Sequence, residues 1–202
     1  MFKFFLFSLL YLLYSSLSFA QKIEPTYGQV SYGPHQVMTL NFWKFESESP
    51  VPLLVHIHGG GWIGGKKNET VSPNELKKGY SFASIDYRLA GTALLPAAVQ
   101  DAARAIQFLR TKAKQWNFNP ARIAVIGGSA GAASSLWLAY HDDMADPKSD
   151  DPVLRQSSRV CGAVATGGQT TLDPFLLEKK IGPACIQHGM IWKTVGAKNI
   201  ED

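Results

Sequence analysis

The pattern of apolar and polar positions divides the chain into segments that alternate between strand-like and helix-like. Near-continuous apolar runs of four to eight residues are typical of strands buried on both faces of a sheet. Such runs are Leu53–Ile57, Tyr80–Asp86 and Ile123–Ile126. From Ala98 to Trp116, apolar residues recur every three or four positions with polar residues between them, which predicts an amphipathic helix.

The remaining segments complete the expected order of elements. We expect an antiparallel pair of strands near the start, a helix after the third apolar run, and one last strand; these are Tyr27–Tyr32 and Val37–Phe42, Ala132–Tyr140, and Arg159–Ala165. Beyond Gly167 the pattern is irregular. Strands that alternate with helices over crossover-length connections predict an α/β fold, a mostly parallel sheet with helices on both faces.

The amino terminus has the three parts of a secretory signal peptide. Lys3 precedes an apolar run, Phe4–Tyr14, and small residues follow up to Ala20. We therefore predict a signal peptide over residues 1–20, cleavage near Ala20, and a secreted or periplasmic protein without stable membrane insertion. The alternative is an uncleaved anchor, because about 17 residues just reach the lower limit for a spanning helix.

Composition narrows the classes of protein and partner. A chain of 202 residues with 46% hydrophobic residues is long enough for one core, so residues 21–202 form a single expected domain. Its net charge is +4, and its Lys and Arg residues are scattered, which argues against nucleic-acid binding. Cys161 and Cys185 could pair in an exported protein, and Asn68 begins a glycosylation sequon; both questions stay open, as does the oligomeric state.

A Gly-x-Ser-x-Gly motif lies between the expected strand Ile123–Ile126 and the helix that follows. The segment Gly127–Gly131 reads GGSAG. A sharp turn between strand and helix holds the serine in a strained backbone and leaves its hydroxyl exposed, so Ser129 is the candidate nucleophile. The alternatives are a structural serine in a glycine-rich turn and a phosphate-binding loop.

A second glycine-rich turn follows the strand Leu53–Ile57. The segment His58–Trp62 reads HGGGW. Adjacent glycines leave backbone N–H groups unobstructed, and such groups can bind the oxyanion of an acyl-transfer intermediate. Because the carboxyl ends of parallel strands meet at one edge of a sheet, we expect this turn and Ser129 to lie together.

The segments HGGGW, Asp86–Arg88 (DYR) and GGSAG resemble the hormone-sensitive-lipase-like branch of the α/β-hydrolases, over about residues 27–173. The resemblance implies that Ser129 attacks an ester and that the N–H groups of Gly60, Gly61 and Ala130 form the oxyanion hole. It also implies that the DYR segment, Pro96 and Asp101 are scaffolding, although Asp86 could equally be an ordinary strand-end residue.

The chain departs from this resemblance after Ser129. An activated serine needs a histidine and an acid, which follow it in the chain in this fold. His141 follows the expected helix Ala132–Tyr140 and is expected to cap it. Asp173 and His188 follow Ser129 in the right order for the acid and the base, but they are a weak alternative because no apolar strand precedes either residue. We expect the acid and the base to lie beyond residue 202, with the domain incomplete at its carboxyl end and the last strands missing.

These observations predict a carboxylic ester hydrolase that acts on small-molecule acyl esters through an acyl-enzyme on Ser129. One alternative is a catalytically inactive α/β-hydrolase-like binding protein or fragment, and another is an exopeptidase or amidase on the same fold. No His or Cys cluster and no dinucleotide loop is present in the sequence, so we predict neither a metal nor a cofactor.

Overall fold

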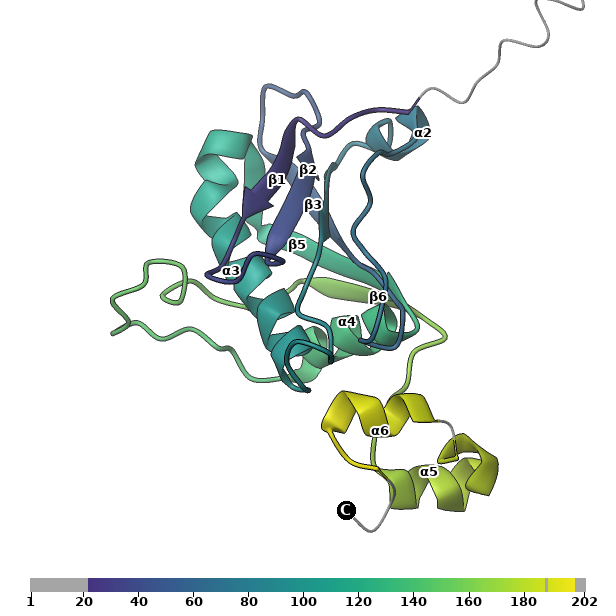
Figure 1. The fold of residues 1–202 in the computed structure, drawn as a ribbon. Helices are drawn as coiled ribbons and strands as arrows, with labels where there is room; N and C mark the ends of the chain where they lie inside the picture. The colour runs from purple at the N-terminus through teal and green to yellow at the C-terminus, as the bar shows by residue number, and fades with distance from the viewer. Residues whose placement is uncertain (1–21, 188, 199–202) are drawn as a thin grey trace, which may run out of the picture.

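The computed structural model describes residues 22–187 and 189–198. A sheet of six strands in the order β1-β2-β4-β3-β5-β6 forms the centre of the fold (Figure 1). The strands are β1 Tyr27–Ser31, β2 Thr39–Trp43, β3 Val51–Ile57, β4 Ser81–Ile85, β5 Phe118–Gly128 and β6 Gly162–Thr166. The first three strands in this order pair antiparallel, and β4, β3, β5 and β6 pair parallel. The predicted antiparallel opening pair and mostly parallel sheet are both confirmed.

Helices connect and flank the strands. They are α2 Pro73–Leu76, α3 Ala97–Trp116, α4 Ala130–Tyr140, α5 Pro174–Ile181, the 3₁₀ turn η1 Pro183–Cys185, and α6 Gly189–Val195. The strand expected at Ile123 in fact begins at Phe118. Asn117 ends α3 in the left-handed conformation (φ 58°), and its backbone oxygen accepts from Val51 N–H, so the chain enters the sheet at once.

The helices cover the two faces of the sheet unequally. Adjacent strand residues point to opposite faces, so Phe42 and Trp43 mark the two sides. Phe42 belongs to the main core, which α3 and α4 cover together, whereas Trp43 packs in a smaller cluster with Phe82 and with Leu76 of α2. Helices therefore lie on both faces, but the face opposite α3 and α4 carries only a single turn of α2 among the described helices.

The segment after Gly167 contains helices, so the expectation of an irregular end was wrong. Asp173 starts α5: its carboxylate accepts hydrogen bonds from the N–H groups of Phe175 (2.9 Å) and Leu176 (3.1 Å), and Pro174 takes the first helical position. Gly182 ends it. α6 then returns to the carboxyl edge of β3, where Met190 contacts Gly61.

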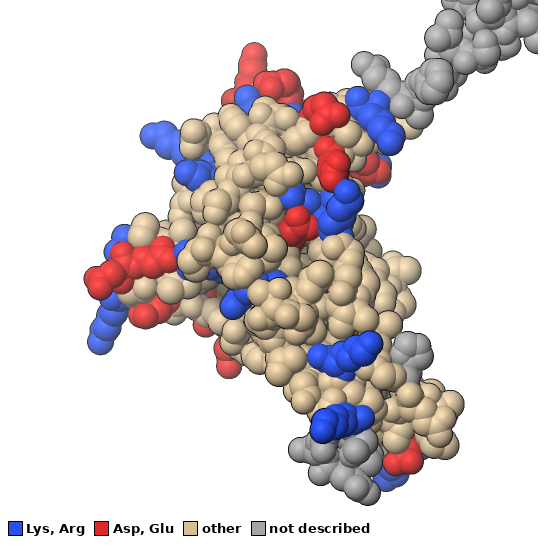
Figure 2. Space-filling model, in the orientation of Figure 1, with Lys and Arg blue, Asp and Glu red and all other residues tan. Residues whose placement is uncertain are grey.

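Other surface expectations can be compared with the same residues. Cys161 and Cys185 are free thiols, so the disulfide left open by the sequence is not formed. On the face drawn in Figure 2, Lys and Arg lie among acidic side chains and do not form one basic patch. No helix within residues 22–187 and 189–198 has the length and apolar character needed to cross a membrane. The predicted signal peptide lies outside the described residues.

Candidate active site

Ser129 occupies a strained turn between β5 and α4. Its φ and ψ are 54° and −122°, a combination that non-glycine residues rarely adopt. The Ser129 N–H donates to the Thr166 backbone oxygen (3.0 Å), and its own backbone oxygen accepts from Ala133 N–H in α4 (3.0 Å). The side chain is exposed, as predicted for a nucleophile at this position.

The flanking glycines allow this turn because no side chain fits at either position. A Cβ on Gly131 would collide with the backbone oxygen of Ile57, and a Cβ on Gly127 would collide with the backbone of Gly131. The start of α4 therefore lies directly against the end of β3. This close approach gives a structural reason for Gly127 and Gly131, the first and last glycines of the GGSAG motif.

The turn after β3 lies beside Ser129, so the two motifs meet at one edge of the sheet as expected. A Cβ on Gly59 would stand 2.8 Å from the Gly128 backbone oxygen and 3.5 Å from Ser129 Cβ. Trp62 ties the same loop to α4, because its indole N–H donates to Ser134 Oγ (3.0 Å). The glycine loop and the serine are thus fixed relative to each other by contacts on both sides.

Three backbone N–H groups are candidates for the oxyanion hole. Gly60 and Gly61 have φ values of +104° and +61°, which glycine adopts without strain. Within the described residues, neither of these N–H groups donates a hydrogen bond. Ala130 is the first residue of α4, where an N–H group has no partner within the helix. All three residues predicted for the hole therefore have N–H groups without a hydrogen-bond partner among the described residues, and of the three only Gly60 is exposed.

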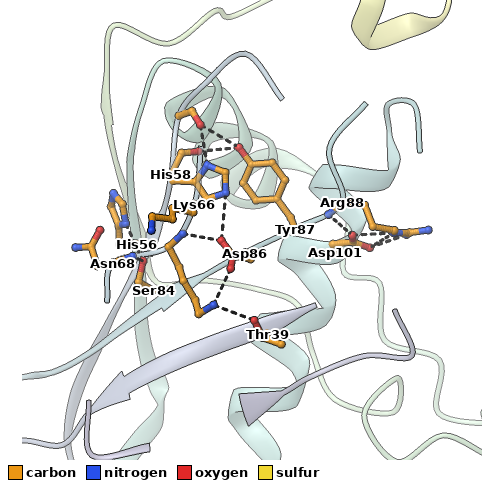
Figure 3. Close-up of polar contacts among 12 residues, drawn as sticks. Thr39, His56, His58, Lys66, Asn68, Ser84, Asp86, Tyr87, Arg88 and Asp101 are labelled. Carbon is orange, nitrogen blue, oxygen red and sulfur yellow. Dashed lines mark hydrogen bonds and ion pairs between the residues drawn. The ribbon is translucent and has the colours of Figure 1, made fainter. Parts of the chain in front are cut away.

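A buried imidazole and a phenol hold the glycine loop from behind (Figure 3). The Gly59 backbone oxygen accepts from His58 Nδ1 at 2.7 Å, and the Tyr87 hydroxyl donates to the His58 backbone oxygen at 2.8 Å. A carbonyl can only accept, so His58 carries its proton on Nδ1. Across the planar trans peptide, fixing the Gly59 oxygen turns the Gly60 N–H in the opposite direction. The loop conformation is thereby set by the side chains beneath it.

The charges around His58 belong to this support. Burial lowers the pKa of His58, and the Gly59 hydrogen bond and Asp86 offset only part of this shift. The imidazole is therefore neutral near pH 7. Its contact with Asp86, 3.7 Å from Nε2 to Oδ1, is for this reason not a salt bridge. Asp86 is paired instead with the buried Lys67, at 2.7 Å. Burial also raises the pKa of Tyr87, which keeps its hydroxyl protonated as a donor.

Arg88 and Asp101 fix the next part of the scaffold. Asp101 lies buried in α3 and accepts from the Arg88 backbone N–H (2.9 Å) and from its guanidinium Nη2 (2.6 Å). This bidentate pair joins the end of β4 to α3 (Figure 3). The contacts of Asp86, Tyr87, Arg88 and Asp101 agree with the scaffolding role inferred from the sequence.

The base and the acid are not placed beside the serine. In the part of the chain that the structure describes, no histidine or carboxylate forms a hydrogen bond with Ser129. His141 caps α4 as expected, with its N–H bonded to the Trp137 oxygen (2.8 Å) and its ring stacked on Trp137. Asp173 caps α5, and His188 lies outside the described residues. The location of the acid and the base stays a prediction.

A largely apolar cavity of about 510 Å³ opens along α4. Trp62 from the glycine loop, Leu95 before α3, Ala133 and Trp137 of α4, and Leu172 after β6 are among its lining residues. Ala133 is one helical turn beyond Ser129. No local sequence pattern indicates this cavity, because its lining residues come from four separate segments of the chain. Separately, no group of three or more His, Cys, Asp or Glu residues among those described is arranged to hold a metal ion.

Comparisons with known proteins identify the family of the chain. The model of the BD-FAE family matches residues 42–192. Carboxylesterase NlhH of Mycobacterium tuberculosis is 33% identical over 101 residues, 48% of this chain and 32% of that protein. Kynurenine formamidase of Debaryomyces hansenii is 28% identical over 127 residues, 59% of this chain and 42% of that protein.

A solved structure confirms the fold. The acetyl ester-xyloside bifunctional hydrolase from Caldicellulosiruptor lactoaceticus superposes with a TM-score of 0.60 at 26% identity, over 77% of this chain and 60% of that one. The chain thus spans less than two thirds of the length of each of these three proteins. The family match covers most of the chain and includes every motif that carries the candidate site. The chain therefore belongs to the BD-FAE family, and its resemblance to the α/β-hydrolase esterases is confirmed.

Proposed function

We propose that this chain supplies the nucleophile and the oxyanion hole of a carboxylic ester hydrolase. Ser129 Oγ forms a bond to the ester carbonyl carbon, and its proton passes to a base that the described contacts of Ser129 do not include. The N–H groups of Gly60, Gly61 and Ala130 bind the resulting oxyanion. The bond to the alcohol then breaks, and water releases the acid from the acyl-enzyme.

One observation carries this proposal: an exposed serine at φ 54° stands against a glycine loop whose N–H groups donate no hydrogen bond within the described residues. A purely structural serine would not need strain, exposure and free donors in one place. Strained backbone of this kind is retained where the surrounding structure enforces it. Here the chain packs so closely around Gly127 and Gly131 that a Cβ at either position would collide with backbone atoms.

The direct test is covalent labelling with a fluorophosphonate, followed by intact-mass measurement and peptide mapping. We expect one adduct, located on Ser129, and no adduct in Ser129→Ala. Ser47→Ala is the matched control, because the Ser47 hydroxyl only accepts a surface-loop hydrogen bond from Ser49 N–H (3.2 Å). Labelling elsewhere, or equal labelling of Ser129→Ala, would refute the assignment and favour an inactive binding protein.

A second candidate is amide hydrolysis, favoured by the similarity to a formamidase. The same serine and oxyanion hole would serve, but an amine leaves less readily than an alcohol and needs a proton from a general acid. Comparing an ester with the amide of the same acid separates the two activities. A kcat/KM ratio of ester to amide well above the intrinsic ratio of their reactivities would support the esterase, and hydrolysis of the amide at a kcat/KM comparable to that of the ester would support the amidase.

We further infer that the protein is exported after cleavage near Ala20, on the basis of Lys3 and the apolar run that follows it. Small-molecule esters are the proposed substrates. Intact-mass measurement of the exported protein tests the leader: a mature chain that begins near Gln21 supports export, and retention of residues 1–20 refutes cleavage.

A further inference from the structure

Met190 of α6 lies directly on the glycine loop. A Cβ placed on Gly61 would collide with Met190 Sδ and would lie only 2.9 Å from its Cγ. Gly61 is buried for this reason, whereas its neighbour Gly60 is exposed. Met190 therefore lies against the same residue whose N–H is proposed for the oxyanion hole.

Contacts on the C-terminal side of Met190 hold α6 in this place. The Leu95 N–H donates to the Thr194 backbone oxygen (2.9 Å), and Thr194 is only 1% exposed. A Cβ on Gly196 would stand 2.5 Å from Leu94 Cδ1, so the end of α6 packs closely on the segment before α3. Met190 itself is half-buried, with one side on the loop and one side open.

The apolar cavity borders the same loop. Trp62, the residue after Gly61, and Leu95, which bonds to α6, both line it. Met190 itself is not among the lining residues, but it lies on the loop between Ser129 and this cavity. An acyl group on Ser129 that extends past Trp62 into the cavity would have to pass the flexible Met190 thioether.

We propose that Met190 is a specificity-determining residue that limits the size of the acyl group accepted by Ser129. This proposal rests on the proposed esterase function and adds the residue that sets its acyl preference. Replacing Met190 with a small residue should open the space next to Gly61 and favour long acyl groups. Replacing it with an apolar residue of similar volume should leave the preference unchanged.

The test compares two phosphonofluoridates that share one alkoxy group and differ in their second substituent, methyl or hexyl, which mimics the acyl chain. Ser129 Oγ bonds to phosphorus, the P–F bond breaks, fluoride leaves, and imidazole in the buffer takes the proton. We expect Met190→Ala to raise the hexyl-to-methyl ratio of labelling rates about tenfold over the unsubstituted protein.

Two controls keep the result interpretable. Met190→Leu conserves volume, and Val195→Ala shortens a side chain of the same helix that is 42% exposed; both should keep the ratio within about twofold. An unchanged ratio in Met190→Ala, with Ser129 still labelled and the thermal transition intact, would overturn the role of Met190 alone. If neither reagent labels Ser129 in the unsubstituted protein, the proposed esterase function fails and this proposal fails with it.

Discussion

The nucleophile turn and the α5–α6 segment border the same edge of the sheet, yet they are held in different ways. Backbone atoms meet with no room for a Cβ at Gly127 and Gly131, so the turn has a single arrangement. In contrast, α5 has no buried residue, and Thr194 is the buried residue of α6. The proposed site is therefore built on close backbone packing, whereas the segment that carries Met190 buries few of its residues.

This difference suggests a division of roles. A serine and an oxyanion hole must be positioned within fractions of an ångström, which tight packing provides. A side chain such as Met190 needs only to occupy space, and a helix that buries few of its residues can hold it there. Substitutions should therefore be poorly tolerated in the turn and well tolerated in α5 and α6, except where a side chain faces Gly61.

The sharpest test of this contrast replaces a glycine with alanine in each region. Gly131→Ala should destabilise the protein by about 3 kcal/mol or more, because the new methyl group meets the Ile57 backbone oxygen. Gly189→Ala in α6 meets nothing within 4 Å and should be neutral or stabilise by up to about 1 kcal/mol. Urea denaturation measures both, and similar losses for the two variants would contradict the comparison.

A smaller effect is expected at the start of α5. Asp173→Ala removes the carboxylate that accepts from the N–H groups of Phe175 and Leu176 and should weaken α5 by about 1 kcal/mol. Asp173→Asn should retain the cap. Amide hydrogen exchange reports the local loss, and the labelling rate of Ser129 should not change in either variant. If both variants lost labelling, Asp173 would act as the acid paired with His188 rather than as a helix cap.

The smallest effect concerns the support beneath the glycine loop. Burial lowers the pKa values of both His56 and His58 from 6.5, so the unfolded chain binds more protons than the folded one in this range. Their neutral forms therefore contribute stability above about pH 6.5, and this is lost as the pH falls toward their folded pKa values. Urea midpoints should be lower at pH 5.5 than at pH 7.5. His58→Asn, which retains a donor for Gly59, should reduce this difference, and an unchanged difference would exclude His58 as a contributor.

The sequence predicted the meeting of the two glycine-rich turns better than the structure of their surroundings for a physical reason. The motifs around Gly61 and Ser129 are local: glycine spacing and a buried strand specify each turn, and parallel pairing brings the turns together. The contact between Met190 and Gly61 joins residues far apart in the chain, and no local pattern indicates it. Helix α5 was missed although Asp173–Pro174 is a start signal, because an exposed helix has only a weak apolar stripe.

Element boundaries show the same limit. α3 was predicted to within one residue because its buried face repeats over five turns, whereas β5 begins five residues earlier than expected. Asn119 and Pro120 indicate a break by composition, but pairing of Phe118 with Val51 extends the strand through them. Tertiary contacts decide such cases, and they cannot be read from a single segment.

The central claim is that Gly60, Gly61 and Ala130 bind the oxyanion formed at Ser129. A crystal structure of the phosphonylated protein tests it most directly, since the phosphoryl oxygen mimics that oxyanion. We predict an adduct on Ser129 Oγ whose phosphoryl oxygen lies about 2.7–3.1 Å from the three backbone nitrogens. A phosphoryl oxygen directed into solvent, or bound by other groups while these N–H groups stay unengaged, would contradict the account.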